Sequence, residues 1–151
     1  MGRFPEPGDA APDFELDGTA GRFALSAQRG TPVVLLFYPR DGSLVCTRQL
    51  CSYRDRWAEL ERLDAVLVAI SGQDLPSHER FAASHGLRIP LLADVGGRVA
   101  RSYGVGSPIL GTRRTTFVLD RGGIVRERRE HPLSLSFDAV DELRRAVAAI
   151  G

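Results

Sequence analysis

The chain contains no lysine and no asparagine. All 20 of its basic residues are therefore arginine, and 19 acidic residues leave a formal charge of +1. Without lysine, this chain has neither the P-loop lysine of many ATP- and GTP-binding proteins nor a Schiff-base lysine. The arginine bias is typical of a GC-rich coding sequence and says little about function. The near-neutral charge argues against a nucleic-acid-binding protein, which normally carries a clustered basic excess.

Long apolar runs and cysteines are also scarce. The longest apolar run, residues 33–38, is too short to span a membrane. The first 12 residues carry charges and three prolines and lack the apolar core of a signal peptide. We therefore expect a cytoplasmic protein, whose thiols are kept reduced. The two cysteines, Cys46 and Cys51, are then more typical of catalysis, redox chemistry or metal binding than of a structural disulfide.

The order of the expected elements predicts the fold class. A chain of 151 residues without an internal linker suggests one domain, residues 1–151. Expected strands alternate with expected helices and a hairpin closes the series, which predicts a three-layer α/β domain with a mixed sheet. The expected strands are 13–16 and 22–25 (an N-terminal hairpin), 33–38, 65–70, an edge piece at 89–92, 115–119 and 124–130; the expected helices are 48–63, 77–84, 95–103 and a last one from Ser136 or Asp138 to about 150.

Cys46 is expected at the beginning of a helix, a few residues after a buried strand. Helix N-termini present free N–H groups and a partial positive charge, which stabilise a thiolate. A thiolate in such a turn is a nucleophile. The position alone is also compatible with an unreactive cysteine that packs in the core like a small hydrophobic residue. A zinc site would need about four ligands, and the three histidines do not have the matching spacing.

The residues around Cys46 carry a family resemblance. Residues 39–46 read Pro-x-x-x-Ser-x-x-Cys, which is similar to the Pro-x-x-x-Thr/Ser-x-x-Cys signature of peroxiredoxins. From about residue 8 to residue 149 the chain resembles the Q branch of that family, also called bacterioferritin comigratory protein. The resemblance implies a thioredoxin-like three-layer sandwich with helices on both faces of a mixed central sheet. The segments that carry it are Phe-Tyr-Pro at 37–39, Cys-Ser-Tyr-Arg-Asp at 51–55, Ile-Pro-Leu-Leu-Ala-Asp at 89–94 and Arg-Thr-Thr-Phe at 114–117.

The resemblance also implies roles for individual residues. Cys46 would be the peroxidatic nucleophile, which attacks the O–O bond and becomes a sulfenic acid. Ser43 would bind the peroxide through its hydroxyl, and Pro39 would keep water from the sulfur. Arg114 would approach Cys46 and stabilise both the thiolate and the charge that develops on the peroxide oxygens.

The implied activity is the reduction of hydrogen peroxide and small organic hydroperoxides without a metal, haem or other cofactor. Thioredoxin or a similar dithiol protein would supply electrons. Nucleic acid and membranes are not expected as partners. The protein would be a monomer or a weak homodimer. The chain departs from the usual pattern at Ser43, where threonine is commoner, at Leu44 and Val45, which replace Pro-Gly, and at Gln49, which replaces a common glutamate.

Cys51 stands where that branch often has its resolving cysteine. Five residues along a helix turn the chain by about 140° net and raise it about 7.5 Å, so the two Cα atoms would lie roughly 8.6 Å apart. A disulfide tolerates at most about 7 Å. Either residues around 42–53 unwind after oxidation, or Cys51 never resolves and remains an inert thiol.

Two other functions stay open. The protein would be a peroxide-sensing redox switch if a partner reads the unwinding, or a one-cysteine peroxidase if Cys51 is inert. The C-x-x-x-x-C spacing disfavours a dithiol oxidoreductase, which usually has C-x-x-C. Outside the motif, we expect surface or capping roles for His78, His85 and His131, a solvated Arg113 and a solvated strand face at 126–130.

Overall fold

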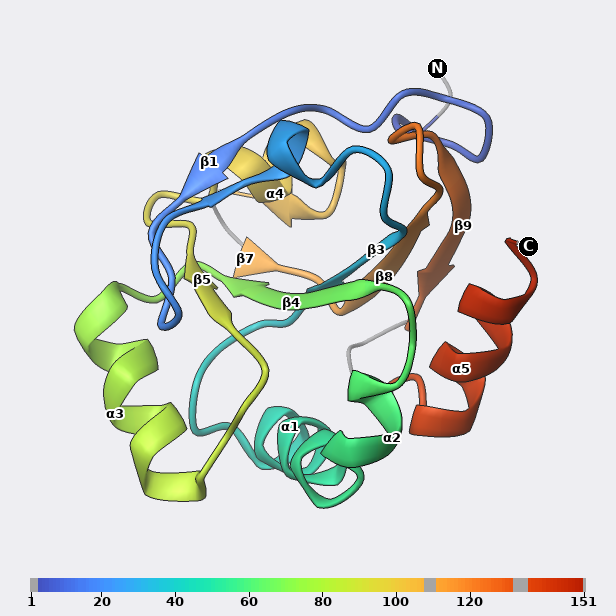
Figure 1. Ribbon diagram of the computed structural model, residues 1–151. Helices are drawn as coiled ribbons and strands as arrows, with labels where there is room; N and C mark the ends of the chain where they lie inside the picture. Colours follow the sequence, from blue (N-terminus) through green and yellow to red (C-terminus); the bar gives the residue numbers. More distant parts are fainter. Residues whose placement is uncertain (1–2, 108–110, 132–135, 151) are drawn as a thin grey trace.

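A central sheet of five strands organises the protein (Figure 1). The computed structural model describes residues 3–107, 111–131 and 136–150. Neighbouring strands pair in parallel from β3 to β4 and from β4 to β5, whereas one strand, β8, runs antiparallel to both of its neighbours, so the sheet is mixed, as expected. In sheet order the strands are β5 (Leu91–Ala93), β4 (Val66–Ser71), β3 (Val33–Phe37), β8 (Thr115–Leu119) and β9 (Val125–Glu130).

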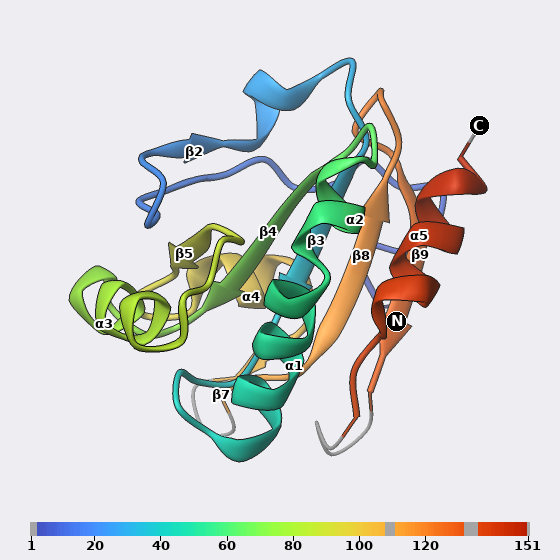
Figure 2. The same ribbon diagram turned by 60° about the horizontal axis from the view of Figure 1, so that its bottom comes forward.

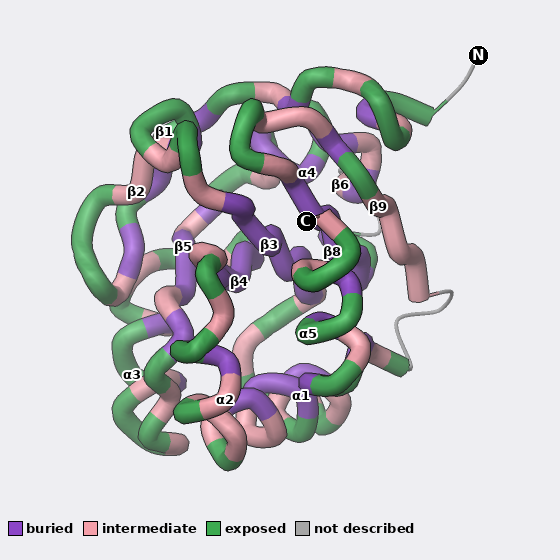
Figure 3. The backbone as a smooth tube through the Cα atoms, turned by 45° about the vertical axis from the view of Figure 1, so that its right-hand side comes forward, coloured by how far each residue is buried: buried purple, intermediate pink, exposed green. Residues whose placement is uncertain are grey.

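Two cores explain why β3 is apolar at every position. Val33, Leu35 and Phe37 belong to the core on one face of the sheet, whereas Val34 and Leu36 belong to the core on the other. Successive side chains of a strand point to opposite faces, so a strand covered on both sides has no polar position. Figure 3 shows the central strands as a buried block inside a more exposed shell.

The two faces of the sheet carry different layers (Figure 2). Four helices pack on one face, below the sheet in Figure 1, and the N-terminal hairpin with one short helix packs on the other. This confirms the expected three-layer sandwich with helices on both faces. The first layer contains α1 (Leu44–Asp55), α2 (Trp57–Glu61), α3 (Leu75–His85) and α5 (Val140–Ala148); the second contains β1 (Glu15–Leu16), β2 (Phe23–Ala24), the 3₁₀ turn η1 (Leu25–Gln28) and α4 (Arg98–Ser102).

Helix boundaries differ from the expected ones for local reasons. The helix expected at 48–63 begins earlier, at Leu44, and breaks at Arg56, whose backbone (φ −118°, ψ 28°) leaves the helical region. The last helix begins at Val140 because Glu142 accepts a hydrogen bond from the backbone N–H of Ala139. In the described part of the chain, no helix is long and apolar enough to cross a membrane.

Two other elements were not anticipated in this form. Helix α4 is shorter than residues 95–103 because Gly96 and Gly97 have positive φ angles of 86° and 73°. A short antiparallel pair, β6 (Gly106–Ser107) with β7 (Gly111–Thr112), was missed because two-residue strands carry no periodic pattern.

A buried carboxylate joins β9 to the segment before α5. Asp138 is fully buried and accepts hydrogen bonds from Nε of Arg129 (2.7 Å) and Nε2 of His131 (3.0 Å). Burial by itself raises the pKa of Asp138, but the hydrogen bonds from His131 and Arg129 outweigh it and hold the pKa below the ordinary value.

The strand face at 126–130 is not fully solvated, contrary to expectation. The side chain of Arg128 is 1% exposed, and its guanidinium lies 5.1 Å from the ring centre of Phe117. The long side chain of Arg128 covers the aromatic ring of Phe117, which belongs to the core. This packing explains how an arginine is accommodated at a largely buried position.

The Asp138 cluster predicts an acid-sensitive contribution to stability. Because its pKa is lowered on folding, Asp138 stabilises the protein fully above the ordinary aspartate value of about 3.9 and loses that effect as the pH falls through the folded-state value. We expect Asp138→Asn to lower the free energy of unfolding by about 1–3 kcal/mol at neutral pH. Urea denaturation at falling pH should show the difference from wild type shrinking below about pH 4.

Asp64→Asn is the control, because Asp64 is an exposed surface carboxylate. Its stability should follow that of the wild type over the whole pH range. A constant difference between Asp138→Asn and wild type down to strongly acidic pH would contradict the assigned role of the carboxylate.

Candidate active site

Cys46 lies in the first turn of α1, with its side chain buried against the sheet. The helix begins here because Ser43 caps it: Oγ of Ser43 accepts a hydrogen bond from the backbone N–H of Cys46 (3.3 Å). Cys46 is 0% exposed. The helix N-terminus therefore directs its partial positive charge toward a sulfur that is shielded from water.

Arg114, the residue just before β8, reaches this sulfur. Thr115 is paired with Phe37 in the antiparallel register, so Arg114 lies beside the end of β3 from which the chain leads to α1. Arg114 is 2% exposed, and its Nη2 donates to Sγ of Cys46 at 2.9 Å. A guanidinium is a charged donor, and its hydrogen bonds are stronger than those of a neutral donor. The structure thus brings together two residues that lie 68 positions apart.

Gln49 and Tyr53 extend this contact into the protein. Nη1 of Arg114 donates to Oε1 of Gln49, and Nε2 of Gln49 donates to the hydroxyl of Tyr53 (3.0 Å). The Tyr53 hydroxyl in turn donates to the backbone carbonyl of Asp138 (2.7 Å). Burial, above all, raises the pKa of Tyr53, so the phenol stays protonated and remains a donor. Sequence reasoning noted Gln49 only as a departure and missed Tyr53.

Pro39 and Ser43 lie in the loop between β3 and α1. The backbone carbonyl of Pro39 accepts a hydrogen bond from Oγ of Ser71 at the end of β4 (3.3 Å). The hydroxyl of Ser43 donates to the carbonyl of Arg40 at 3.5 Å, a long contact that a better acceptor can replace. A groove of about 290 Å³ opens beside Pro39 and Arg40.

Cys51 lies further along the same helix. Both thiols are free; Cys46 is buried and Cys51 is partly exposed. Helix α1 continues without a break from Leu44 to Asp55, so the separation calculated for an intact helix applies to this pair. Leu44, one of the two residues that depart from the usual Pro-Gly, is 75% exposed next to the site.

Among the histidines, His78 differs most from expectation. His78 is fully buried rather than a surface or capping residue, and its Nδ1 lies 2.7 Å from Oδ2 of Asp41 in the β3–α1 loop. Arg113 is exposed and donates to the carbonyl of Gly104. Among the described residues, no three His, Cys, Asp or Glu side chains gather as metal ligands.

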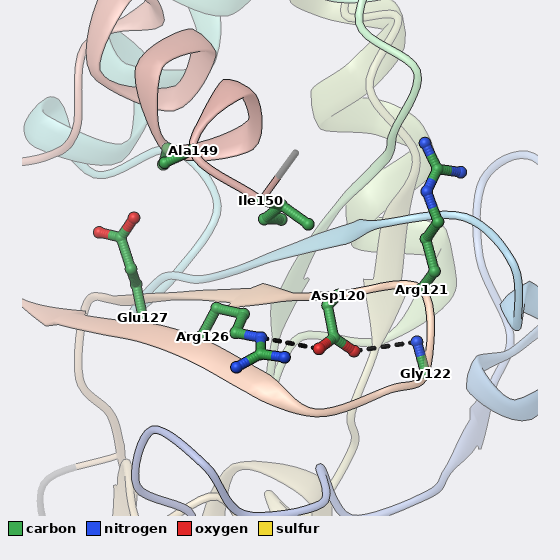
Figure 4. A pocket seen from close by; sticks show the side chains of 8 residues that line it. Asp120, Arg121, Gly122, Arg126, Glu127, Ala149 and Ile150 are labelled. Carbon is green, nitrogen blue, oxygen red and sulfur yellow. Dashed lines mark hydrogen bonds and ion pairs between the residues drawn. The ribbon is translucent and has the colours of Figure 1, made fainter.

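A cavity of about 600 Å³ lies elsewhere, between the β8–β9 turn and the end of α5 (Figure 4). Asp120 on its floor accepts hydrogen bonds from Nε of Arg126 (2.7 Å) and the backbone N–H of Gly122 (2.9 Å). Neither cysteine lines it. The cavity is therefore separate from the Cys46 site.

The fold and the site define a class: a thioredoxin-like α/β protein with a buried cysteine that is held by an arginine at a helix N-terminus. Residues 7–128 match the sequence model of the AhpC/TSA family. The chain belongs to the AhpC/TSA family, and within it the chain resembles Q-type peroxiredoxins.

Individual relatives support this assignment. Chloroplastic peroxiredoxin Q proteins of Oryza sativa subsp. japonica and Arabidopsis thaliana are 40% identical over 121 residues, which are 78% of this chain and 56% of each relative. The chain thus spans little more than half the length of these curated relatives. Peroxidoxin BcpB of Mycobacterium tuberculosis has 32% identity and a TM-score of 0.81, with 96% of each chain covered. AhpC of Enterococcus faecalis, at 24% identity and a TM-score of 0.85 over 95% of this chain and 91% of that one, shares the fold.

Because Gln49 makes two buried hydrogen bonds, we expect its replacement to destabilise the protein. Gln49→Leu takes away an acceptor of the Arg114 guanidinium and a donor to Tyr53, so we expect the free energy of unfolding to fall by about 1–3 kcal/mol. Urea denaturation measures the change. Arg48→Gln, an exposed change on the same helix, should stay within about 0.5 kcal/mol of wild type. Equal stabilities of the two variants would contradict the role assigned to Gln49.

Proposed function

We propose that this protein is a thiol-dependent peroxidase that reduces hydrogen peroxide and small organic hydroperoxides. The observation that carries the proposal is the 2.9 Å contact between Nη2 of Arg114 and the buried Sγ of Cys46 at the N-terminus of α1. Family membership and the similarity to Q-type peroxiredoxins support it.

In the first step, the Cys46 thiolate attacks one oxygen of the peroxide. The S–O bond forms, the O–O bond breaks, and water or an alcohol leaves after taking up a proton, so Cys46 becomes a sulfenic acid. Arg114 stabilises the negative charge that passes from sulfur to the leaving oxygen, because a fixed guanidinium needs no rearrangement during the step. Ser43 would redirect its hydroxyl from the Arg40 carbonyl to the peroxide, and Pro39 would limit the access of water.

In the second step, the Cys51 thiol attacks the sulfenic sulfur, a disulfide forms and water leaves. The continuous helix holds the two cysteines too far apart for a disulfide. The first turns of α1 must therefore unwind before this step. A dithiol protein of the thioredoxin type would then reduce the disulfide, which places the cycle in a reducing compartment.

Single cysteine variants test the first step. Cys46→Ser should reduce peroxide consumption to the uncatalysed background, because the nucleophile is lost. Cys51→Ser makes the same chemical change at the other cysteine and serves as its matched control; it should consume one equivalent of peroxide and then turn over poorly with thioredoxin. A peroxide electrode measures both, with thioredoxin or dithiothreitol as reductant. Continued turnover of Cys46→Ser would refute the peroxidase assignment.

Peptide mapping tests the second step, because trypsin separates the two cysteines. Cleavage after Arg40, Arg48 and Arg54 leaves Cys46 on peptide 41–48 and Cys51 on peptide 49–54. After one equivalent of peroxide, we expect these peptides to be linked under non-reducing conditions, with a mass lower by two hydrogen atoms than their sum. Persistent sulfenic acid on the first peptide and a free thiol on the second would instead favour a one-cysteine peroxidase or a redox sensor.

A further inference from the structure

A cluster of hydrogen bonds ties the β3–α1 loop to α3. The carboxylate of Asp41, in this loop, accepts hydrogen bonds from the hydroxyl of Tyr38 (2.6 Å), Oγ of Ser77 (2.8 Å) and Nδ1 of His78 (2.7 Å). The backbone N–H of Asp41 donates to Oε1 of Gln73 (3.0 Å). The loop is therefore held by its side chain and by its backbone.

His78 connects the loop to β5 through its two ring nitrogens. Its Nε2 lies 3.0 Å from the carbonyl oxygen of Leu92 in β5, and its Nδ1 faces the Asp41 carboxylate. Each ring nitrogen of His78 thus has a polar partner within hydrogen-bond distance. Because the ring is fully buried, these partners take the place of water.

Other groups around the pair keep Asp41 ionised. Burial alone would raise the pKa of Asp41, but hydrogen bonds from His78 and Tyr38 lower it below the ordinary value. Burial and the negative charge of Asp41 raise the pKa of Tyr38, so its hydroxyl remains a donor. The carboxylate of Asp41 and the ring of His78 are thus in direct contact.

The place of Asp41 in the chain gives this pair a consequence for catalysis. Asp41 follows Pro39 by two residues and precedes Ser43 by two, so it lies between the proposed water shield and the proposed peroxide-binding hydroxyl. His78 is fixed at its other nitrogen to β5, in a part of the fold that carries neither cysteine. The loop is therefore anchored to a framework that unwinding of α1 does not disturb.

We propose that His78 is a positioning residue of the peroxide reaction: through Asp41 it holds Pro39 and Ser43 in the arrangement that surrounds Cys46. This inference rests on the proposed peroxidase function. His78 touches no reacting atom and transfers no proton; it acts by fixing the loop. Small misplacements of groups around a reacting centre can cost about 100-fold in rate.

Two substitutions of similar size separate the two hydrogen bonds of His78. The amide N–H of Asn takes the place of Nδ1, so His78→Asn keeps a donor toward Asp41 and loses the bond to Leu92. The longer Gln places its amide near Nε2, so His78→Gln keeps the bond to Leu92 and loses the tie to Asp41. His85→Gln, on the same helix and outside the site, is the matched control.

The measurement is the first turnover of reduced protein that also carries Cys51→Ser, mixed with an excess of hydrogen peroxide. The observed rate constant then reports the reactivity of the folded molecules, and the amplitude reports how many of them there are. A substitution that only lowers the fraction of folded protein therefore changes the amplitude and leaves the rate constant unchanged. We expect His78→Gln to lower the rate constant by about 10- to 100-fold, whereas His78→Asn keeps most of it and His85→Gln keeps all of it.

Equal rate constants for His78→Gln and His78→Asn would overturn the inference, whatever their amplitudes. If His78→Gln does not fold, Asp41→Ala removes the same hydrogen bond from the loop side. Asp41→Ala should then lower the rate constant to a similar extent. An unchanged rate constant in Asp41→Ala would also overturn the inference. Failure of the proposed function would give a different result: the Cys51→Ser protein with His78 and His85 unchanged would then consume no peroxide.

Discussion

The contact between the Arg114 guanidinium and the Cys46 sulfur is the constraint on which much of this structure depends. A buried charge is costly unless it is paired and hydrogen-bonded, so the fold must supply partners for the guanidinium inside the core. Sγ of Cys46 and Oε1 of Gln49 are two such partners, and both come from one face of α1. The position of α1 on the sheet and the chemistry of the site are therefore settled by the same interaction. The chain Gln49–Tyr53–Asp138 then carries this constraint to the segment that precedes α5.

Helix α1 has two requirements that conflict. Its N-terminus must be intact to cap at Ser43 and to present Cys46 to Arg114. The same regular helix keeps Cys51 beyond the reach of a disulfide. In the cycle proposed for this protein, each turnover must break and rebuild the first turns of the helix. The loop before the helix is held independently, by the pair of Asp41 and His78, so a change in α1 need not spread to β3.

Several features were predictable because they depend on local pattern. The strand at 33–37 is a continuous apolar run, the strand at 115–119 is rich in β-branched and aromatic residues, and the turn between 119 and 125 contains two glycines, so their positions follow from composition and turn chemistry. The motif at 39–46 and the arginine at 114 carried the family resemblance, and the structure brings Cys46 and Arg114 into contact. The break at Arg56 was not predicted, because no proline or glycine marks it in the sequence. The start of α5 was placed too early, because the hydrogen bond from the N–H of Ala139 to Glu142 sets it.

The sequence by itself determined the class of fold, the identity of the thiol and the conflict between helix geometry and a disulfide, since these follow from residue order and spacing. Only the tertiary structure decided which side chains complete the site. Tyr53 meets Asp138 across 85 residues, and Asp41 meets His78 across 37. No local pattern distinguishes a buried histidine that pairs with a loop carboxylate from one that caps a helix. That difference arises when β3, α3 and β5 pack together and exclude water, because a polar group must then find its partner inside the protein.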